Sequence, residues 1–135
     1  MNRFFYTFKI KTMANFSETQ IKRVWEALTK SPNDDPNVFR YDGCGAMLKF
    51  DDYNKLESDF CWTIDHKYPV SLGGNDHPLN LHALHYKNNE KKANDFPDFK
   101  GAVQWNPNTR KNEAAIIKEF CMDVDLPNKI ASVLV

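Results

Sequence analysis

Residues 60–94 read FCWTIDHKYPVSLGGNDHPLNLHALHYKNNEKKAN. The opening residues 60–64 are rich in aromatic and β-branched types, which favour a β-strand. The following residues 67–79 hold two prolines and a Gly-Gly pair and therefore predict a long loop. A second short strand is expected at about residues 80–84 and a helix at about residues 85–93. The segment thus predicts two strands followed by a helix.

Polar residues stand where this unit would bring them together. Asp65 and His66 directly follow the first strand, and Asn89 lies on the helix, on the same face as His85 four residues earlier. If the helix packs against the two strands, Asn89 can face Asp65. Carboxylate and amide oxygens are hard ligands that suit Mg²⁺. We therefore expect Asp65 and Asn89 to hold a divalent metal, Mg²⁺ in the first place, with Mn²⁺ as the alternative.

His66 follows Asp65 in the same extended segment, so its side chain is expected on the opposite side of the backbone. There its imidazole can take a proton from an attacking water, while the metal neutralises charge on a scissile phosphate. This division of work is suited to cutting a phosphodiester. Because the base acts in its neutral form, activity is expected to fall below the ordinary histidine pKa of roughly 6.5.

The segment also carries an ordered pattern: D-H-x-x-P-x-S-x-G-G, then N-L-x-x-L, then N-x-x-K. In this order the pattern resembles the HNH endonuclease family, which has the ββα-metal fold. The resemblance covers about residues 41–94, less than half of the chain. It implies a metal-dependent nuclease whose partner is double-stranded DNA.

The resemblance assigns roles to single residues. It implies that His66 is the general base and that Asn80, the middle residue of the motif, braces the loop and so the imidazole. Asn89 stands where the family has its last His or Asn and would hold the metal together with Asp65. Lys92 matches the trailing Lys of the motif and would contact a phosphate. Two further candidates for phosphate contacts lie on the same helix: Lys87 and Lys91.

Many relatives frame this motif with two C-x-x-C pairs that hold a structural zinc, and this chain departs from that pattern. Cys44 is present, but Tyr41 stands where its partner would be, and His85 and Asn88 replace the second pair. One Cys and one His cannot close a four-ligand zinc site. We therefore expect no structural zinc, and in its place packing by aromatic residues: Tyr41, Trp62 and Tyr86.

His85 has a second interpretation, as a ligand of the catalytic metal. In bacteriocin-type relatives, a His four residues before the last ligand also binds the metal, and His85 has that spacing to Asn89. His85 is therefore a candidate third ligand. A nitrogen ligand would make softer metals competitive with Mg²⁺.

The flanking segments predict further elements. A capping box at residues 17–20, followed by apolar residues at helical spacing, predicts a helix over residues 18–30. A second amphipathic helix is expected over residues 113–122, whereas residues 98–110 have an irregular pattern. Residues 4–11 alternate in the manner of a strand.

These elements together predict an α+β fold in three parts. Residues 1–40 would form an N-terminal arm with one helix, and residues 41–97 the ββα-metal nuclease core. Residues 98–135 would form a C-terminal extension with one helix. The core is thus expected between flanking helices.

The amino-acid composition limits the kinds of partner that the protein is expected to bind. The 135 residues include 18 Lys and Arg and 18 Asp and Glu, so the net charge is zero. This balance argues against a protein that coats nucleic acid by bulk attraction, although a few placed cations suffice for phosphate contacts. No apolar run approaches the ~20 residues of a membrane span, and the N-terminus lacks the pattern of a signal peptide. We therefore expect a cytoplasmic protein with reduced cysteines and no membrane partner.

Two classes of function follow. The first is a DNA endonuclease of a restriction or phage type. A homodimer of it would place two sites on opposite strands and cut both, whereas a monomer would nick. The alternative is a catalytically weak nucleic-acid-binding module on the same fold. The intact set of Asp65, His66 and Asn89 favours the enzyme.

Overall fold

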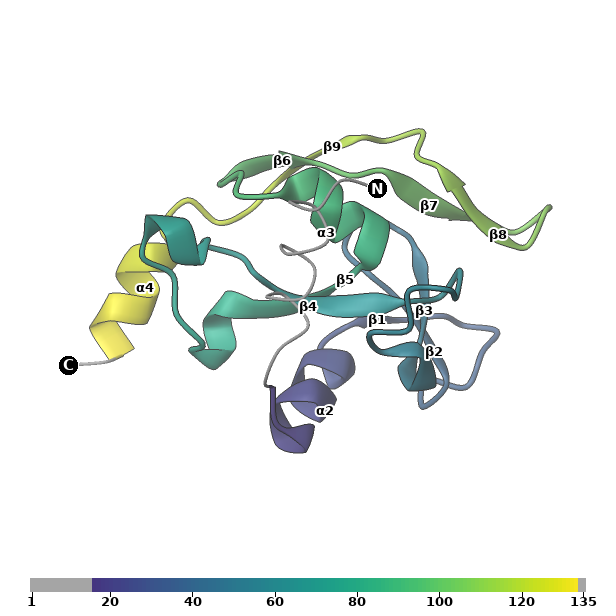
Figure 1. Cartoon of the computed structure of the whole chain (residues 1–135), viewed down its shortest axis with the longest axis horizontal. Helices are drawn as coiled ribbons and strands as arrows, with labels where there is room; N and C mark the ends of the chain where they lie inside the picture. Colours follow the sequence, from purple (N-terminus) through teal and green to yellow (C-terminus); the bar gives the residue numbers. More distant parts are fainter. Residues whose placement is uncertain (1–15, 134–135) are drawn as a thin grey trace.

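The computed structural model describes residues 16–133, which form an α+β fold of helices and small antiparallel sheets (Figure 1). At its centre β4 (Trp62–His66) pairs with β5 (Leu81–His85), and α3 (Tyr86–Lys92) follows directly. The sequence predicted these three elements in this order, and their observed bounds differ from the predicted ones by one or two residues. The strand expected at residues 4–11 lies outside the described residues.

Helices cover both faces of the β4–β5 sheet. α2 (Glu18–Glu26) lies on one face and α3 on the other (Figure 1). Side chains alternate along a strand, so Trp62 and Ile64 of β4 point to α2 and join its Val24 and Trp25 in the main hydrophobic core. Thr63 and Asp65, which alternate with them along β4, point to α3. The two faces of β4 are therefore different environments, one apolar and one polar.

Helix α2 begins with the predicted capping box at Ser17. It ends at Glu26, short of the predicted end at residue 30. The buried Arg40 explains the early end, because its guanidinium donates to the carbonyl oxygens of Glu26 and Leu28 at 3.0 and 3.2 Å. The chain then continues as the short strand β1 (Thr29–Lys30).

Strand β1 belongs to a three-stranded antiparallel sheet with β2 (Phe39–Tyr41) and β3 (Met47–Lys49). A 3-10 helix, η1 (Phe50–Asp52), follows β3. The turn between β2 and β3 is fixed by the buried Asp42, whose Oδ1 accepts from two backbone N–H groups of the turn at 2.9 and 2.8 Å. Gly45 supplies the left-handed conformation that this turn needs, with φ of +91°.

The C-terminal region differs from its prediction. The prediction of a helix over residues 113–122 is wrong, and so is the prediction that residues 98–110 are irregular. Both segments form strands, which pair antiparallel as β6 with β9 and β7 with β8. Their bounds are β6 (Asp98–Lys100), β7 (Val103–Asn106), β8 (Lys111–Ala114) and β9 (Glu119–Cys121). A last helix, α4 (Leu126–Val133), was not predicted.

Tertiary contacts explain why the helical pattern failed. The Asn112 side chain accepts from the backbone N–H of Met47 at 2.8 Å and donates to its carbonyl at 2.9 Å, so it fixes β8 against β3. Ile117, in the middle of the expected amphipathic helix, is 63% exposed. Phe120 packs on Phe99 across the β6–β9 pair, with ring centroids 5.5 Å apart. Such contacts outweigh the weak helical preference of a short segment.

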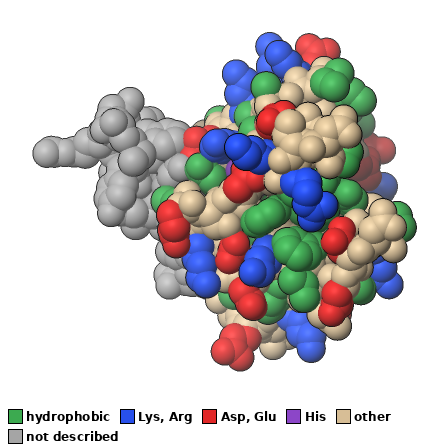
Figure 2. Space-filling view, turned by 90° about the vertical axis from the view of Figure 1, so that its right-hand side faces the viewer, with side chains coloured by type: hydrophobic (Ala, Val, Ile, Leu, Met, Phe, Trp, Pro, Cys, Tyr) green, Lys and Arg blue, Asp and Glu red, His purple; other side chains and the backbone are tan. Residues whose placement is uncertain are grey.

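The surface of the described residues carries charges of both signs. On the face shown in Figure 2, Lys and Arg side chains are interspersed with Asp and Glu. Within residues 16–133, no helix is long and apolar enough to cross a membrane.

Candidate active site

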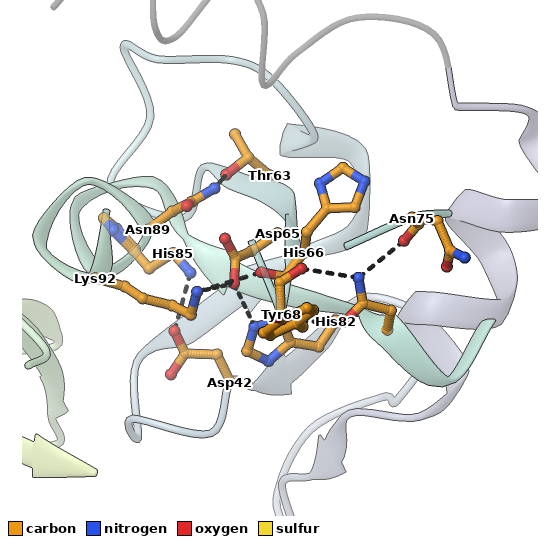
Figure 3. A network of polar contacts seen from close by, with 11 residues as sticks. Asp42, Thr63, Asp65, His66, Tyr68, Asn75, His82, His85, Asn89 and Lys92 are labelled. Carbon is orange, nitrogen blue, oxygen red and sulfur yellow. Dashed lines mark hydrogen bonds and ion pairs between the residues drawn. The ribbon is translucent and has the colours of Figure 1, made fainter. Parts of the chain in front are cut away.

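Asp65 lies on the α3 face of β4 and is 7% exposed. Its cross-strand partner on β5 is His82, and paired residues of neighbouring strands point to the same face. The Oδ2 atom of Asp65 is 2.7 Å from Nε2 of His82 and 3.2 Å from Nζ of Lys92 (Figure 3). Two nitrogen groups, one from β5 and one from α3, therefore hold the same carboxylate oxygen.

Lys92 does not reach the surface. Its side chain is fully buried, and its ammonium also donates to the carbonyl oxygen of His66 at 3.2 Å. Lys92 is therefore not placed to make the phosphate contact that the sequence had predicted. Helix α3 directs its side chain into the interior, toward Asp65. The other two candidate lysines, Lys87 and Lys91, are exposed on α3. The ammonium of Lys87 lies over the Tyr86 ring.

Asn89 lies on α3 one turn before Lys92 and faces β4. Its Nδ2 donates to Oγ1 of Thr63 at 2.7 Å, and its Oδ1 is buried without a hydrogen-bond partner among residues 16–133. Thr63 and Asp65 are two residues apart on the same face of β4. In Figure 3 the second carboxylate oxygen of Asp65 points away from Lys92 and His82, toward the side of Asn89. Asp65 and Asn89 thus both lie between β4 and α3, on the same face of the strand.

His66 is the last residue of β4, and its imidazole points to the opposite side of the strand from the Asp65 carboxylate (Figure 3). Its Nε2 lies 2.6 Å from Oδ1 of Asp76, and its ring is 5.9 Å from the Phe16 ring. The contact with Asp76 leaves Nδ1 as the nitrogen that can accept a proton. The side chain is 23% exposed, so water can reach it.

Asn80 is fully buried and braces the loop of residues 67–79. Its Oδ1 accepts from the N–H of Tyr68 at 2.8 Å, and its Nδ2 donates to the carbonyls of Tyr68 and Asn75 at 3.0 and 2.8 Å. Gly74 allows the loop to fold this tightly, because a Cβ at this position would lie 1.7 Å from the Tyr68 carbonyl oxygen. Asn80 therefore fixes the loop that carries Asp76, the partner of His66.

His85 is not brought to Asp65. It pairs with Trp62, at the other end of β4, and caps the start of α3. Its Nε2 contacts the carbonyl oxygen of Asp59 at 2.7 Å, and its Nδ1 accepts from the N–H of Lys87 at 3.1 Å. Burial lowers the pKa of His85, which favours the neutral ring. Both ring nitrogens of His85 are thus engaged in hydrogen bonds within the fold. His85 is therefore not placed to act as the third metal ligand that the sequence suggested.

Polar contacts join the turn that carries Cys44 to the start of α3, the two segments at which no structural zinc was expected. Asp42 Oδ2 accepts from the His85 N–H at 2.9 Å and from Asn88 Nδ2 at 3.0 Å. Asn88 Oδ1 accepts in turn from two backbone N–H groups, at 2.7 and 2.8 Å, between β6 and β7. Burial, next to Asp42, raises the pKa of the Cys44 thiol, and the thiolate is the form that binds metals. Of the aromatic residues expected to pack here, Tyr86 stacks on His85 with centroids 5.0 Å apart, and Trp62 packs on Trp25 and Tyr53 with centroids 5.5 and 4.7 Å apart.

Three residues near the site were not singled out in the sequence. His82 contacts Asp65, Asp76 contacts His66, and Arg23 of α2 lines a hollow of about 160 Å³ together with Asp76. The strand pattern indicated that some residue of β5 would oppose Asp65. It did not say which one, because a long loop does not set the register of the two strands.

The donor set at Asp65 and Asn89 is one carboxylate and one amide oxygen. Among residues 16–133, no three His, Cys, Asp or Glu side chains form a group that could hold a metal ion. Comparisons with protein-family models, with curated proteins and with solved structures gave no match to this chain.

Proposed function

We propose that this chain is a metal-dependent endonuclease of the HNH type, which hydrolyses phosphodiester bonds of double-stranded DNA. The elements β4, β5 and α3 would be its ββα-metal core. The observation that carries the proposal is the buried Oδ1 of Asn89, which has no hydrogen-bond partner in the described part of the chain and lies on the face of β4 that carries Asp65. An unpaired buried carbonyl oxygen costs about 1–3 kcal/mol, so a ligand for it is expected.

The residues present fit a Mg²⁺ ion. Asp65 would supply the oxygen that His82 and Lys92 do not contact, and Asn89 would supply Oδ1. Mg²⁺ commonly takes one or two protein oxygens and completes its shell with water and phosphate oxygens. When bound, the ion would neutralise charge on the scissile phosphate and on the leaving 3′ oxygen.

The remaining residues would handle the attacking water. His66 would take its proton at Nδ1, because Nε2 is engaged with Asp76 at 2.6 Å. Asp76 would hold the imidazole in that orientation, and Asn80 would hold the loop that carries Asp76. Asp65 and His66 are the last two residues of β4, so both can act at the end of the strand.

DNA would be held mainly through its backbone. The exposed lysines of α3, Lys87 and Lys91, lie on one side of the core, and Arg23 of α2 lies on the other, near Asp76. The mixture of charges on the surface in Figure 2 and the zero net charge favour a few local phosphate contacts over general attraction. A monomer would nick the duplex, and a homodimer would cut both strands.

One observation favours the second candidate function, a nucleic-acid-binding module without catalysis. Lys92 already supplies a positive charge to Asp65, at 3.2 Å, so the carboxylate is compensated without any metal. On this alternative the same fold binds DNA or RNA, and Asp65, Asn89 and Lys92 are structural. The alternative leaves the unpaired Asn89 Oδ1 unexplained.

Supercoiled plasmid cleavage separates the two functions. The wild type should convert the plasmid with Mg²⁺ or Mn²⁺ and not with EDTA. His66→Ala should bind DNA in a gel-shift assay but lose cleavage, and His77→Ala, a partly exposed histidine in the same loop, should cleave like the wild type. A folded wild-type protein that shifts DNA but leaves it intact with either metal would favour the binding module.

A further inference from the structure

The side chain of Lys92 is a cation placed inside the candidate metal site, and no step of the proposed reaction uses it. It is fully buried, and its ammonium contacts Asp65 Oδ2 and the carbonyl oxygen of His66, both at 3.2 Å. A buried ammonium is retained only when it is paired and hydrogen-bonded. Lys92 is therefore set permanently beside the carboxylate that the proposed function assigns to the metal.

We propose that Lys92 is an internal counter-ion that competes with the metal for Asp65 and so keeps metal affinity low. This inference rests on the proposed function. A divalent ion at Asp65 would lie close to the ammonium of Lys92 in a partly buried site, where like charges repel more strongly than in water. The buried position leaves the ammonium little freedom to move away when the ion binds.

His82 acts on the same oxygen from the other strand. Its Nε2, 2.7 Å from Oδ2, and Nζ of Lys92 both approach that oxygen, so the carboxylate is fixed in rotation (Figure 3). Only Oδ1 is then offered to an ion, and Asp65 binds it through one oxygen. Hydrogen bonds of this kind, from groups behind a ligand, set its orientation and its strength. Lys92 and His82 are therefore positioning residues of the metal site.

Direct Mn²⁺ binding tests the inference without any catalysis. The free Mn²⁺ signal in electron paramagnetic resonance is titrated with wild type, with Lys92→Met and with Lys22→Met, an exposed position on α2. Lys92→Met should bind Mn²⁺ roughly 10- to 100-fold more tightly, because a neutral chain of similar length removes the repulsion. Lys22→Met should bind like the wild type, and Asp65→Ala should lose the binding.

The outcomes separate this inference from the function on which it rests. If the wild type binds Mn²⁺ through Asp65 and Lys92→Met binds no more tightly, the inference is overturned and the nuclease proposal stands. If neither the wild type nor Lys92→Met binds Mn²⁺, or if Asp65→Ala still binds it, the proposed metal site is wrong and the inference is overturned with it.

Folding of the variant gives a second readout. Without its counter-ion, Asp65 is a buried charge, so Lys92→Met should have a lower melting temperature than the wild type in EDTA. Mn²⁺ should restore most of that loss, since the ion replaces the ammonium. A Lys92→Met protein that stays unfolded both in EDTA and in excess Mn²⁺ would show that Lys92 is only a structural residue and would overturn the inference.

Discussion

Asp65 and His66 are neighbours in the chain, but their surroundings differ. Asp65 lies under α3 at 7% exposure, held by His82 and by the fully buried Lys92. His66 points to the other side of β4, is 23% exposed, and its imidazole contacts Asp76 of the loop and lies near the Phe16 ring. The alternation of a strand thus gives one site two sides, a rigid side built from the core and an accessible side that depends on a loop.

This difference predicts how each side responds to change. On the Asp65 side, ligand and structural residues are packed together, so a substitution can affect the fold. On the His66 side, a substitution should change the reaction while the free energy of unfolding changes little. The substitutions that follow probe these two sides, from the largest expected effect to the smallest.

Asn89→Leu should reduce metal-dependent cleavage by about 10³-fold, because it removes a ligand oxygen worth several kcal/mol in the transition state. The free energy of unfolding should change by only about 1 kcal/mol. The substitution removes the hydrogen bond to Thr63, which is unfavourable, but it also removes the unpaired Oδ1, which offsets that loss. Plasmid cleavage and urea unfolding measure the two effects.

The adjacent Asn88→Leu is the matched control, and it should lower the free energy of unfolding by about 3 kcal/mol or more. It deprives Asp42 and the backbone of Val103 of buried hydrogen bonds. If Asn89→Leu were as unstable as Asn88→Leu, Asn89 would be a structural residue of the same kind.

Asn80→Ala should lower cleavage by about 10²-fold, because the loop would no longer hold Asp76 against His66. Three hydrogen bonds to Tyr68 and Asn75 are lost, so the Tyr68 amide should exchange its hydrogen faster. Native-state hydrogen exchange and cleavage rates test this, with the exposed Asn94→Ala as the control. Full activity in a protein with a fast-exchanging Tyr68 amide would argue against the bracing role.

Asp76→Asn should reduce cleavage by roughly 10-fold or more, since a residue that orients a basic histidine contributes in this range or above. Asp76 is 62% exposed, so the free energy of unfolding should stay within about 0.5 kcal/mol of the wild type. Asp51→Asn, another exposed carboxylate, should leave cleavage unchanged. Equal cleavage rates for the two variants would show that Asp76 does not contribute to the reaction.

Replacing both Lys87 and Lys91 by Gln should give the smallest effect, a few-fold weaker DNA binding with an unchanged rate of cleavage at saturating DNA. Each lost phosphate contact should lower the slope of log K against log salt by about 1. Binding measured at several salt concentrations tests this. An unchanged slope would place the DNA on another surface, such as the α2 side that carries Arg23.

The core of the fold could be predicted because its signals are local. Aromatic and β-branched residues mark β4, the loop of residues 67–79 carries its own Pro and Gly, and α3 ends near Asn94. The C-terminal strands could not be predicted in this way. Their pairing depends on distant contacts, such as that of Asn112 with Met47, which no short pattern contains.

The site was predictable only in part, for the same physical reason. Asp65 and Asn89 come together because strand and helix periodicity place them on facing surfaces. His82 depends on the register of β5, and Asp76 on the path of a braced loop, so both required the structure. The inward course of Lys92 follows from the close packing of α3 on β4, which the motif alone does not specify.

The most direct test is the location of a metal in the protein. Crystals soaked in Mn²⁺ should give one strong anomalous peak within about 2.3 Å of Oδ1 of both Asp65 and Asn89, with waters completing the shell. Lys92 and His82 should remain on Oδ2. A structure at saturating Mn²⁺ without a peak at this position, or with the peak at His85 and Cys44 instead, would contradict the proposed site.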